Sequence, residues 1–452
     1  MKTKQLFDRV FLKRLLVLSG PILLQNLFMV LGSSVTTLMT GSLGDAAIAA
    51  SGLLRQFTFF FSLVLFGVSS GCAVFTAQFW GKNDKASIHK TLGIALILGV
   101  AAGILFTVFA FAAPYLFLRL FTKDPAVIAA GSRLLRIAGP SFLLLPLIYA
   151  YTYIQRTTGE TRLPMLSSGL GVLTNLLLGY GLIHGKFGLP NLGVDGAAAA
   201  NLASRIAESG LLIYLTYRYK TSLAARLRDL FSFDRAFFKR VIHRVLPVIS
   251  NEFIWGLGMT AYSAIFARLG TEAYAAVTIK DSVENILFVP ALGITGACAV
   301  LVGNTIGVGK PEKAQSYVRQ TVLLIASIGL VLGTILFLGR EWFLGLFNVS
   351  NETRKIAAQL FLVLAAVQWL RSSNFVFFVG MMRSGGDTRF AYKMDVGAMW
   401  GIGVPLALIG TLILKLPLHL VYLLIMCEEV VKFLVSIRRY RSKRWIHNVV
   451  NN

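Results

Sequence analysis

Apolar stretches of roughly 20 residues recur along the whole chain, separated by short polar turns. Each stretch is long enough to cross a hydrocarbon layer of ~30 Å as an α-helix. Transmembrane barrel strands would appear instead as alternating segments of about ten residues, whereas residues 91–114 form one continuous run rich in Ala, Leu, Ile and Gly. The sequence therefore predicts an all-α integral membrane protein with twelve transmembrane helices, near 15–40, 46–77, 91–115, 127–154, 164–185, 194–217, 242–267, 273–305, 318–339, 355–381, 391–414 and 417–438.

The composition excludes two other classes of protein. Charged residues make up only 14% of the 452 residues, whereas a soluble globular chain is about a quarter charged. Hydrophobic residues make up 56%, far more than a disordered chain contains. The three cysteines, Cys72, Cys298 and Cys427, are scattered through the predicted helices. They lack the paired spacing of a disulfide framework or a metal site, so we expect neither.

The net charge of +24 is unevenly distributed between the two sides of the predicted helices. If the N-terminus starts inside the cell, the cytoplasmic segments hold 30 of the 44 Lys and Arg residues and the outer loops hold 10. Because Lys and Arg are retained in cytoplasmic loops, we expect a protein of the cell membrane with both termini in the cytoplasm. The basic flanks 2–14 and 438–444 would contact anionic membrane lipids. The basic loops carry no nucleic-acid-binding motif, so nucleic acid is not an expected partner.

The second half of the chain repeats the first, and the spacing between matched residues stays close to half the length of the chain. The matched blocks include Pro21 with Gln25-Asn26 and Pro247 with Asn251-Glu252, Leu43-Gly44 and Leu269-Gly270, Cys72 to Val74 and Cys298 to Val300, and Arg156 with Gly159 to Arg162 and Arg383 with Gly386 to Arg389. Matches in one order at a nearly constant spacing indicate two homologous halves. Six helices return each half to the side where it began, so we expect two six-helix bundles related by a pseudo-twofold axis along the membrane normal. The expected domains are an N-terminal lobe (1–220), a basic cytoplasmic linker (221–241) and a C-terminal lobe (242–452).

Several of these motifs resemble those of the multidrug and toxic compound extrusion (MATE) family. They are the turns 159–164 and 386–389, the Gly-Pro and Leu-Pro pairs at Pro21 and Pro247, and the run Leu-Gly-Val-Asp-Gly-Ala-Ala-Ala-Ala at 192–200. The resemblance covers nearly the whole chain. It implies a V-shaped cleft between two bundles and export of organic, mostly cationic compounds by alternating access, in exchange for H⁺ or Na⁺. We therefore expect small organic substrates, no cofactor other than the coupling ion, and a monomer.

Glu252 is the first candidate for cation coupling. A charge at the centre of a spanning helix costs about 2.5–3.5 kcal/mol on insertion scales and persists mainly where it has a partner or a function. Glu252 follows Pro247 by five residues, and a proline inside a helix frees a backbone carbonyl nearby. Many members of the MATE family have a coupling carboxylate in the corresponding helix. The alternative is that Glu252 is a fixed ion-pair partner within its lobe.

The next predicted helix contains Lys280, Asp281 and Glu284, and Arg371 lies in the span 355–381. Lys280 and Glu284 are four residues apart and share a helix face. Around a common interior, these four residues and Glu252 would form one network of two cations and three carboxylates. Protonation of Glu252 or Asp281 would then release Arg371 or Lys280. Alternatively, Lys280 and Asp281 lie near the outer end of the helix and extend to water.

The first lobe departs from the family pattern. It has no Asp or Glu between Leu15 and Thr40, where several MATE branches have an aspartate, so we expect the cation site in the C-terminal lobe. The span 360–383 also lacks a carboxylate, whereas the sodium-type branch tends to have one there. A cage of six or so oxygen ligands is then hard to assemble, and H⁺ is favoured over Na⁺ as the coupling ion.

Other polar and aromatic residues are predicted around the substrate path. In the first lobe these are Gln25, Asn26, Asn175 and Arg55, with Asn251 and Trp255 next to Glu252 in the second. Trp255 could stack on a cationic substrate or pack in the core. Arg205 and Glu208 are three residues apart and should neutralise each other.

Glu428 and Lys432 are predicted to form a local ion pair near the cytoplasmic end of the last helix, and not a site.

A second transport function remains open. Arg55, Arg205, Lys280 and Arg371 could hold a pyrophosphate, which favours a flippase for lipid-linked saccharides from the same superfamily. A membrane-embedded enzyme is not expected, because the spans contain no His/Asp constellation, metal-ligand spacing or Ser-based motif.

Overall fold

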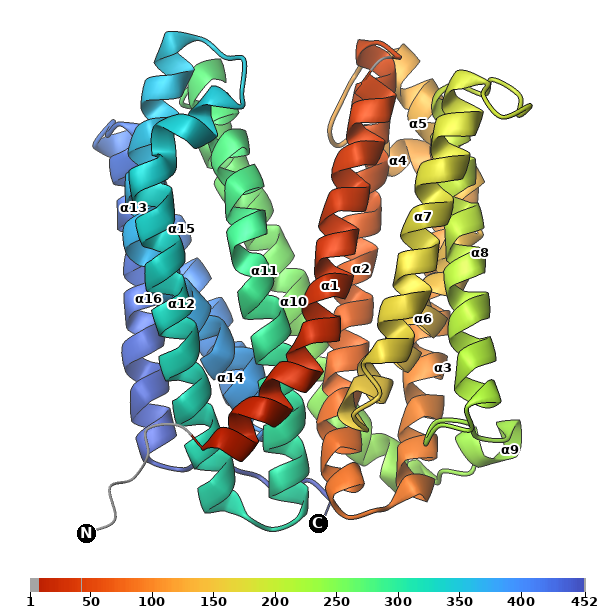
Figure 1. Ribbon diagram of the computed structural model, residues 1–452. Helices are drawn as coiled ribbons and strands as arrows, with labels where there is room; N and C mark the ends of the chain where they lie inside the picture. Colours follow the sequence, from red (N-terminus) through yellow and green to blue (C-terminus); the bar gives the residue numbers. More distant parts are fainter. Residues whose placement is uncertain (1–7, 42, 451–452) are drawn as a thin grey trace. The chain divides into compact units, whose positions relative to one another are not determined.

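The computed structural model describes residues 8–41 and 43–450, and these residues are almost entirely helical (Figure 1). The helices of the first half are α1 (Arg9–Gly41), α2 (Asp45–Gly81), α3 (Lys85–Ala112), α4 (Pro114–Leu118), α5 (Pro125–Ala138), α6 (Ser141–Thr157), α7 (Arg162–His184), α8 (Val194–Arg218) and α9 (Leu227–Leu230). Those of the second half are α10 (Arg235–Ala267), α11 (Thr271–Gly307), α12 (Pro311–Gly345), α13 (Asn351–Phe375), η1 (Val376–Arg383), α14 (Thr388–Ala398), η2 (Met399–Gly403), α15 (Val404–Leu408), η3 (Ile409–Ile413) and α16 (Leu418–Arg441).

Several of these helices are long and apolar enough to cross a membrane. Eight pass on length and composition, or nine when α5 and α6, which meet at an angle of 54°, are counted as one span. Helices α8, α10 and α16 are more polar but also long, at 25, 33 and 24 residues. If these three also span, the described residues are consistent with twelve transmembrane segments, and the exact number stays a prediction.

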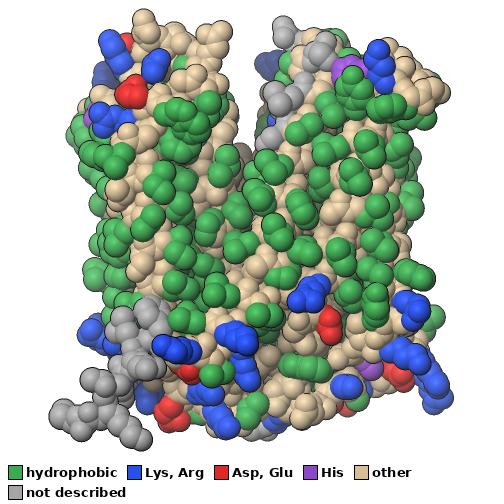
Figure 2. Space-filling view, in the orientation of Figure 1, with side chains coloured by type: hydrophobic (Ala, Val, Ile, Leu, Met, Phe, Trp, Pro, Cys, Tyr) green, Lys and Arg blue, Asp and Glu red, His purple; other side chains and the backbone are tan. Residues whose placement is uncertain are grey.

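The surface has the distribution expected for a protein in lipid. Large hydrophobic side chains are exposed along the helices, for example Leu105, Leu338 and Ile413. On the face drawn in Figure 2, hydrophobic side chains cover the middle of the helices and Lys and Arg gather near their ends. Soluble proteins rarely expose so much apolar surface. The prediction of an all-α, multi-pass membrane protein is confirmed, whereas the pseudo-twofold axis stays a prediction.

Contacts divide the chain into two compact units. We call residues 24–249 the N-terminal unit, and residues 1–23 together with 250–452 the C-terminal unit. The boundaries therefore fall inside α1 and α10, just after Pro21 and Pro247, and not at the predicted linker, which belongs to the N-terminal unit. A proline inside a helix removes one backbone hydrogen bond, so each of these two helices contributes its halves to different units.

Glycines with positive φ recur at matching places in the two halves. Gly44 and Gly270, which the sequence repeat pairs, precede α2 and α11 with φ of 92° and 111°. Gly159 and Gly386, also paired by the repeat, turn the chain before α7 and α14 with φ of 90° and 84°. Non-glycine residues rarely adopt such angles. The sequence repeat thus corresponds to a repeated backbone geometry at the turns.

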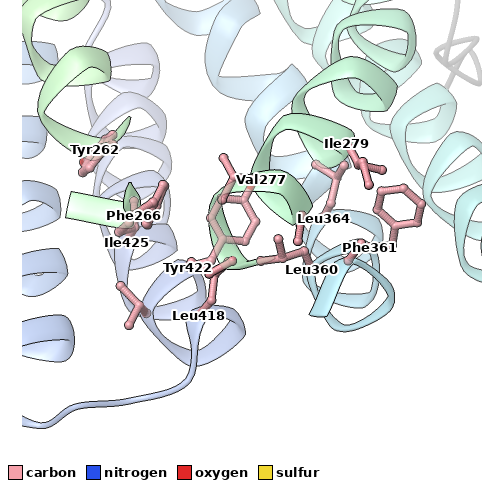
Figure 3. Packing of buried hydrophobic residues seen from close by; sticks show 14 of the residues in the cluster. Tyr262, Phe266, Val277, Ile279, Leu360, Phe361, Leu364, Leu418, Tyr422 and Ile425 are labelled. Atoms are coloured by element: carbon pink, nitrogen blue, oxygen red, sulfur yellow. The ribbon is translucent and has the colours of Figure 1, made fainter. Parts of the chain in front are cut away.

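Each unit has its own hydrophobic core. In the N-terminal unit, Phe57 and Phe61 of α2 pack against Phe106 and Phe142. In the C-terminal unit, side chains from α10, α11, α13 and α16 meet in the cluster shown in Figure 3, which includes Phe266, Leu364 and Ile425. The first half of α1 also belongs to the C-terminal unit, where the ring of Phe11 stacks on Tyr317 at 4.3 Å.

Three π-helical segments, η1, η2 and η3, interrupt the helices of the C-terminal unit. Such segments are uncommon and occur frequently at functional sites. Gly403 ends η2 at a crowded position, because a Cβ atom there would overlap with Tyr262 Oη and Glu428 Oε2. The absence of a side chain at residue 403 therefore lets these two polar groups approach the helix.

Both ends of the described chain reach the same part of the C-terminal unit, the beginning of α12. The backbone N–H of Asp8 donates to Gln320 Oε1 at 2.7 Å, and Tyr440 Oη donates to the carbonyl of Gln315 at 3.2 Å. Beyond α16, the chain folds back so that Trp445 is fully buried beside Gly385. Asp8 and Tyr440 thus lie near the same end of this unit, and the cytoplasmic placement of both termini stays a prediction.

Candidate functional site

Glu252 forms a buried ion pair, although its partner is not the one predicted. It lies on α10, only 7% exposed, and its Oε1 accepts a hydrogen bond from Arg383 Nη2 of η1. Arg383 is 6% exposed. Two opposite charges taken out of water together are tolerated where geometry pairs them directly. The expectation that Arg371 pairs with Glu252 is wrong, because Arg371 lies with Glu284.

The residue before Glu252 links this pair to a second charged group. Asn251 Nδ2 donates to Asp395 Oδ2 of α14 at 3.1 Å, and the ammonium of Lys432 on α16 lies 2.9 Å from Asp395 Oδ1. Asp395 and Lys432 were not among the predicted site residues. Both could have been proposed from the sequence, since each is an ionisable residue inside a predicted span.

Lys432 is shared among three carboxylates. Besides Asp395, its Nζ lies 3.6 Å from Glu428 Oε1 and 3.8 Å from Glu429 Oε1. The predicted pairing of Glu428 with Lys432 is therefore present. The interpretation of this pair as merely local is wrong, because the side chain of Lys432 is only 5% exposed and reaches α14.

Neutral side chains complete the surroundings of the two glutamates. Tyr262 Oη of α10 donates to Glu428 Oε2 at 2.9 Å. Asn374 Nδ2 of α13 donates to Glu429 Oε2 at 2.6 Å and to its backbone carbonyl at 2.8 Å. The glutamates of α16 are thus tied to α10 and α13 as well as to α14.

A second group of charges lies on α11 and α13. Lys280 Nζ is 3.0 Å from Glu284 Oε2 and 2.6 Å from Asp281 Oδ1, and Arg371 pairs with Glu284 Oε1. The predicted pairing of Lys280 with Glu284 is confirmed. Lys280 does not extend to water, because its side chain is 7% exposed and its ammonium lies 4.7 Å from the ring centre of Tyr422. Asp281 is half exposed.

These contacts replace the single predicted network with two. Glu284, Arg371, Lys280 and Asp281 form one, and Glu252 belongs to the other with Arg383, through the Asn251 amide. Both reach α16, where Arg371 Nη1 donates to Tyr422 Oη at 3.4 Å and also interacts electrostatically with Glu429, a carboxylate of the Lys432 group.

The polar interior of the N-terminal unit is built around Gln25. Its Oε1 accepts a hydrogen bond from Arg156 Nη2, and its Nε2 donates to Ser168 Oγ at 2.7 Å. Ser168 in turn donates to Glu208 Oε1 at 2.7 Å, and Arg205 Nη1 lies 2.7 Å from Glu208 Oε2. The predicted pairing of Arg205 with Glu208 is confirmed.

The remaining predicted residues have separate positions. Asn26 is half-buried, Arg55 is exposed on α2, and Asn175 accepts a hydrogen bond from Thr36 Oγ1 at 2.9 Å. Trp255 packs against the core cluster of the C-terminal unit, which corresponds to the core-packing alternative. In the described part of the chain, no three His, Cys, Asp or Glu side chains are arranged to hold a metal ion.

Duplicated helical units with ionisable groups buried inside are the organisation of membrane transporters built from parallel repeats. The MatE family model matches the chain twice, over residues 21–181 and 247–409. The chain therefore belongs to the MatE family of transporters. The two matched segments begin at Pro21 and Pro247, which the internal repeat also pairs.

Two similar proteins match this chain over most of their length. The probable multidrug resistance protein NorM of Thermotoga maritima is 23% identical over 440 residues, covering 96% of this chain and 93% of that protein. The probable multidrug resistance protein YoeA of Bacillus subtilis is 27% identical over 398 residues, covering 86% and 84%.

Solved structures share the fold. A MATE crystallised in complex with MaL6 superposes with a TM-score of 0.86 at 20% identity, covering 96% of this chain and 97% of that one. A mutant of the Vibrio cholerae MATE transporter VcmN gives a TM-score of 0.89 at 15% identity, covering 98% and 99%.

Proposed function

We propose that this chain is a multidrug efflux transporter of the cell membrane, which exports organic, mostly cationic compounds by alternating access in exchange for protons. The observation that carries the proposal is the buried ion pair between Glu252 and Arg383. Its carboxylate is the group that would take up the coupling proton. The names of the relatives, which are multidrug resistance proteins, support the substrate class.

Protonation of Glu252 would change the contacts of three elements. A neutral carboxyl group no longer attracts Arg383, so the guanidinium on η1 would shift its interaction toward Asp395, with which it already interacts electrostatically. Asp395 on α14 is itself held by Asn251 and Lys432. One proton would thus alter the attraction between α10, η1 and α14, which is the differential contact that a transport cycle with two states needs.

The energetics of such an exchange are simple. One proton against one monovalent cation moves no net charge across the membrane, so each pH unit would supply about 1.4 kcal/mol. A substrate of higher charge adds a contribution of about 2.3 kcal/mol per 100 mV of membrane potential. Both termini are proposed to lie in the cytoplasm, in keeping with the excess of Lys and Arg in the segments assigned to that side.

Purified protein in liposomes tests the proposal. An imposed proton gradient should drive accumulation of a fluorescent cationic dye, and Glu252→Gln should reduce that rate at least tenfold while the protein stays folded. The matched control is Glu352→Gln, since the side chain of Glu352 is 66% exposed. Exchanging Na⁺ for another monovalent cation without a pH gradient separates the coupling ions. A fully active Glu252→Gln variant would remove Glu252 from the mechanism.

The alternative is a flippase for lipid-linked saccharides. It is favoured by the N-terminal unit, where Arg156 and Arg205 are accompanied by a single carboxylate, Glu208, so that positive charge is in excess. Dye efflux and translocation of a labelled lipid pyrophosphate should be compared in the same vesicles. Lipid translocation without dye efflux would establish this alternative.

A further inference from the structure

The connected charges inside the C-terminal unit do not balance. Five carboxylates and four cations lie in the two networks with side chains no more than 22% exposed. The carboxylates are Glu252, Glu284, Asp395, Glu428 and Glu429, and the cations are Lys280, Arg371, Arg383 and Lys432. Asp281 is half exposed, and Asp387 pairs separately with Arg439. A buried charge without a counter-charge is strongly disfavoured and is neutralised instead.

The surplus lies around Lys432, where three carboxylates share one ammonium. Asp395 is the best compensated, with Lys432 at 2.9 Å and the Asn251 amide at 3.1 Å. Glu429 accepts the Asn374 amide at 2.6 Å and also interacts electrostatically with Arg371. Glu428 has Lys432 only at 3.6 Å, and its other partner is the uncharged hydroxyl of Tyr262. With its side chain 6% exposed, Glu428 is the most buried and least compensated of the three.

The same group of side chains also lacks hydrogen-bond donors. Asn251 and Asn374, each 3% exposed, direct their Nδ2 atoms to Asp395 and Glu429, and the Oδ1 atoms of both amides have no donor among the described residues. A buried acceptor without a donor carries the full cost of its lost hydration. A protonated carboxyl group brings an O–H donor in addition to removing a negative charge. One proton therefore removes the surplus negative charge and adds one O–H donor to this group of side chains.

Glu428 also packs closely against the backbone of the neighbouring segment η2. Gly403, at the end of the π-helical segment η2, leaves the space that Glu428 and Tyr262 occupy together. The charged or titratable neighbours of this position are Lys432 and Glu429 on α16, Asp395 on α14 and Tyr262 on α10. Glu252 and Arg383 form the next ion pair, next to Asn251, whose amide contacts Asp395.

We propose that Glu428 is a proton-binding residue of the C-terminal unit, separate from Glu252, and that it holds the proton which neutralises the surplus carboxylate. The proton converts the Glu428 carboxylate to a carboxylic acid, and Lys432 is then held by Asp395 and Glu429. This proton uptake does not require the transport activity proposed above. Only its use in coupling, as a second proton carrier, rests on that function.

Infrared spectroscopy of the purified protein at pH 7 tests the proposal without transport. Exposed carboxyl groups, with ordinary pKa values of about 4, are ionised at this pH. The C=O stretch of a protonated carboxyl group should therefore come from the interior, and Glu428→Gln should abolish it. Lys432→Gln adds a second surplus charge and should double the band. Combining Lys432→Gln with Asp395→Asn should restore the wild-type intensity.

Removing any one of the buried carboxylates would balance the charges. A second experiment is therefore needed to assign the proton to Glu428. Tyr262→Phe removes only the hydroxyl that contacts Glu428 Oε2, and it should shift the frequency of the band. The matched control is Tyr422→Phe, whose hydroxyl contacts Arg371 and which should leave the frequency unchanged. The Tyr262→Phe shift does not depend on whether Glu428→Gln folds.

The outcomes distinguish this inference from the proposed function. An undiminished band in folded Glu428→Gln, or an unshifted band in Tyr262→Phe, overturns it. The predicted infrared changes without proton-driven dye transport by the wild-type protein would leave the proton site standing and reject the antiport. If Glu428 is the proton site and the protein is a proton-driven antiporter, Glu428→Gln should also reduce the transport rate driven by the proton gradient at least tenfold. Glu352→Gln serves as the control.

Discussion

In both units, an arginine near the end of a helix bonds to the helix that carries the repeated proline. Arg156 of the N-terminal unit donates to Gln25, and Arg383 of the C-terminal unit donates to Glu252. The two arginines occupy equivalent positions in the internal repeat. Their acceptors occupy neighbouring repeat positions, since Gln25 corresponds to Asn251. The contact is therefore common to both units, whereas the charge of the acceptor is not.

This difference separates what the fold needs from what proton binding needs. Both a neutral amide and a carboxylate can accept a hydrogen bond from the arginine. The contact between the two helices therefore does not require a charged acceptor. Only a carboxylate loses its attraction for the arginine when it is protonated. Among the interior groups described above, cations outnumber carboxylates in the N-terminal unit, and carboxylates outnumber cations in the C-terminal unit. Proton uptake is accordingly expected in the C-terminal unit.

The largest expected effect is that of Arg383→Met. It leaves Glu252 buried without its cation, and removing one partner of a buried pair destabilises a protein by about 3–5 kcal/mol. Thermal unfolding in detergent should show this loss, and proton-driven dye transport should disappear. Unchanged unfolding would mean that the ion pair is not buried inside the protein. The double variant with Glu252→Gln should recover stability but not transport.

Arg156→Met tests the same contact in the other unit and should have a smaller effect. It removes a cation from a neutral amide, so the expected loss of stability is about 1–3 kcal/mol, the penalty for an unsatisfied buried polar group. Proton-driven transport should keep its pH dependence. A loss as large as that of Arg383→Met, measured in the same unfolding assay, would contradict the distinction between the units.

Gln25→Glu would give the N-terminal unit the ion pair that it lacks. Because this unit has an excess of cations, the new carboxylate should pair with Arg156 and stabilise the protein by roughly 1 kcal/mol at neutral pH. The gain should vanish as the pH falls, since a protonated carboxyl no longer pairs with the guanidinium. Unfolding midpoints at pH 5 and pH 8 provide the measurement. Equal gains at both values would exclude titration of residue 25.

Asp281→Asn should have the smallest effect. Asp281 was predicted as a coupling residue, but its side chain is 49% exposed and Lys280 also pairs with buried Glu284. Exposed ion pairs contribute about 0–1 kcal/mol. We expect transport within about twofold of wild type and an unchanged pH profile. A tenfold loss would restore Asp281 to the coupling site.

The sequence predicted the helices and the repeat because both depend on local patterns. Glu252 was also predictable, as a carboxylate inside an apolar span. Its partner was not, because Arg383 directly precedes a turn in the sequence and contacts Glu252 of α10 from the end of the π-helical segment η1. A π-helical turn contains more residues than an α-helical one and so changes which residues share a face.

The site around Lys432 was missed for a related reason. Four-residue spacing predicts contacts along one helix, and it gave the pairing with Glu428 correctly. The contact with Asp395 joins α16 to α14 and depends on which faces of the two helices meet. No spacing within either segment contains that information. The same holds for Gly403, which matters because its lack of a side chain leaves room for Tyr262 Oη and Glu428 Oε2.

The burial of Trp445 makes residues 445–449 part of the folded unit. They pack against the Gly385–Gly386 turn, which closely follows Arg383, and Gly386 pairs with Ile446 in an isolated bridge. A version of the protein shortened before residue 445, or carrying a bulky fusion close behind it, would therefore disturb the anchor of Arg383 without altering any helix. Activity comparisons between tagged and untagged protein should take this into account.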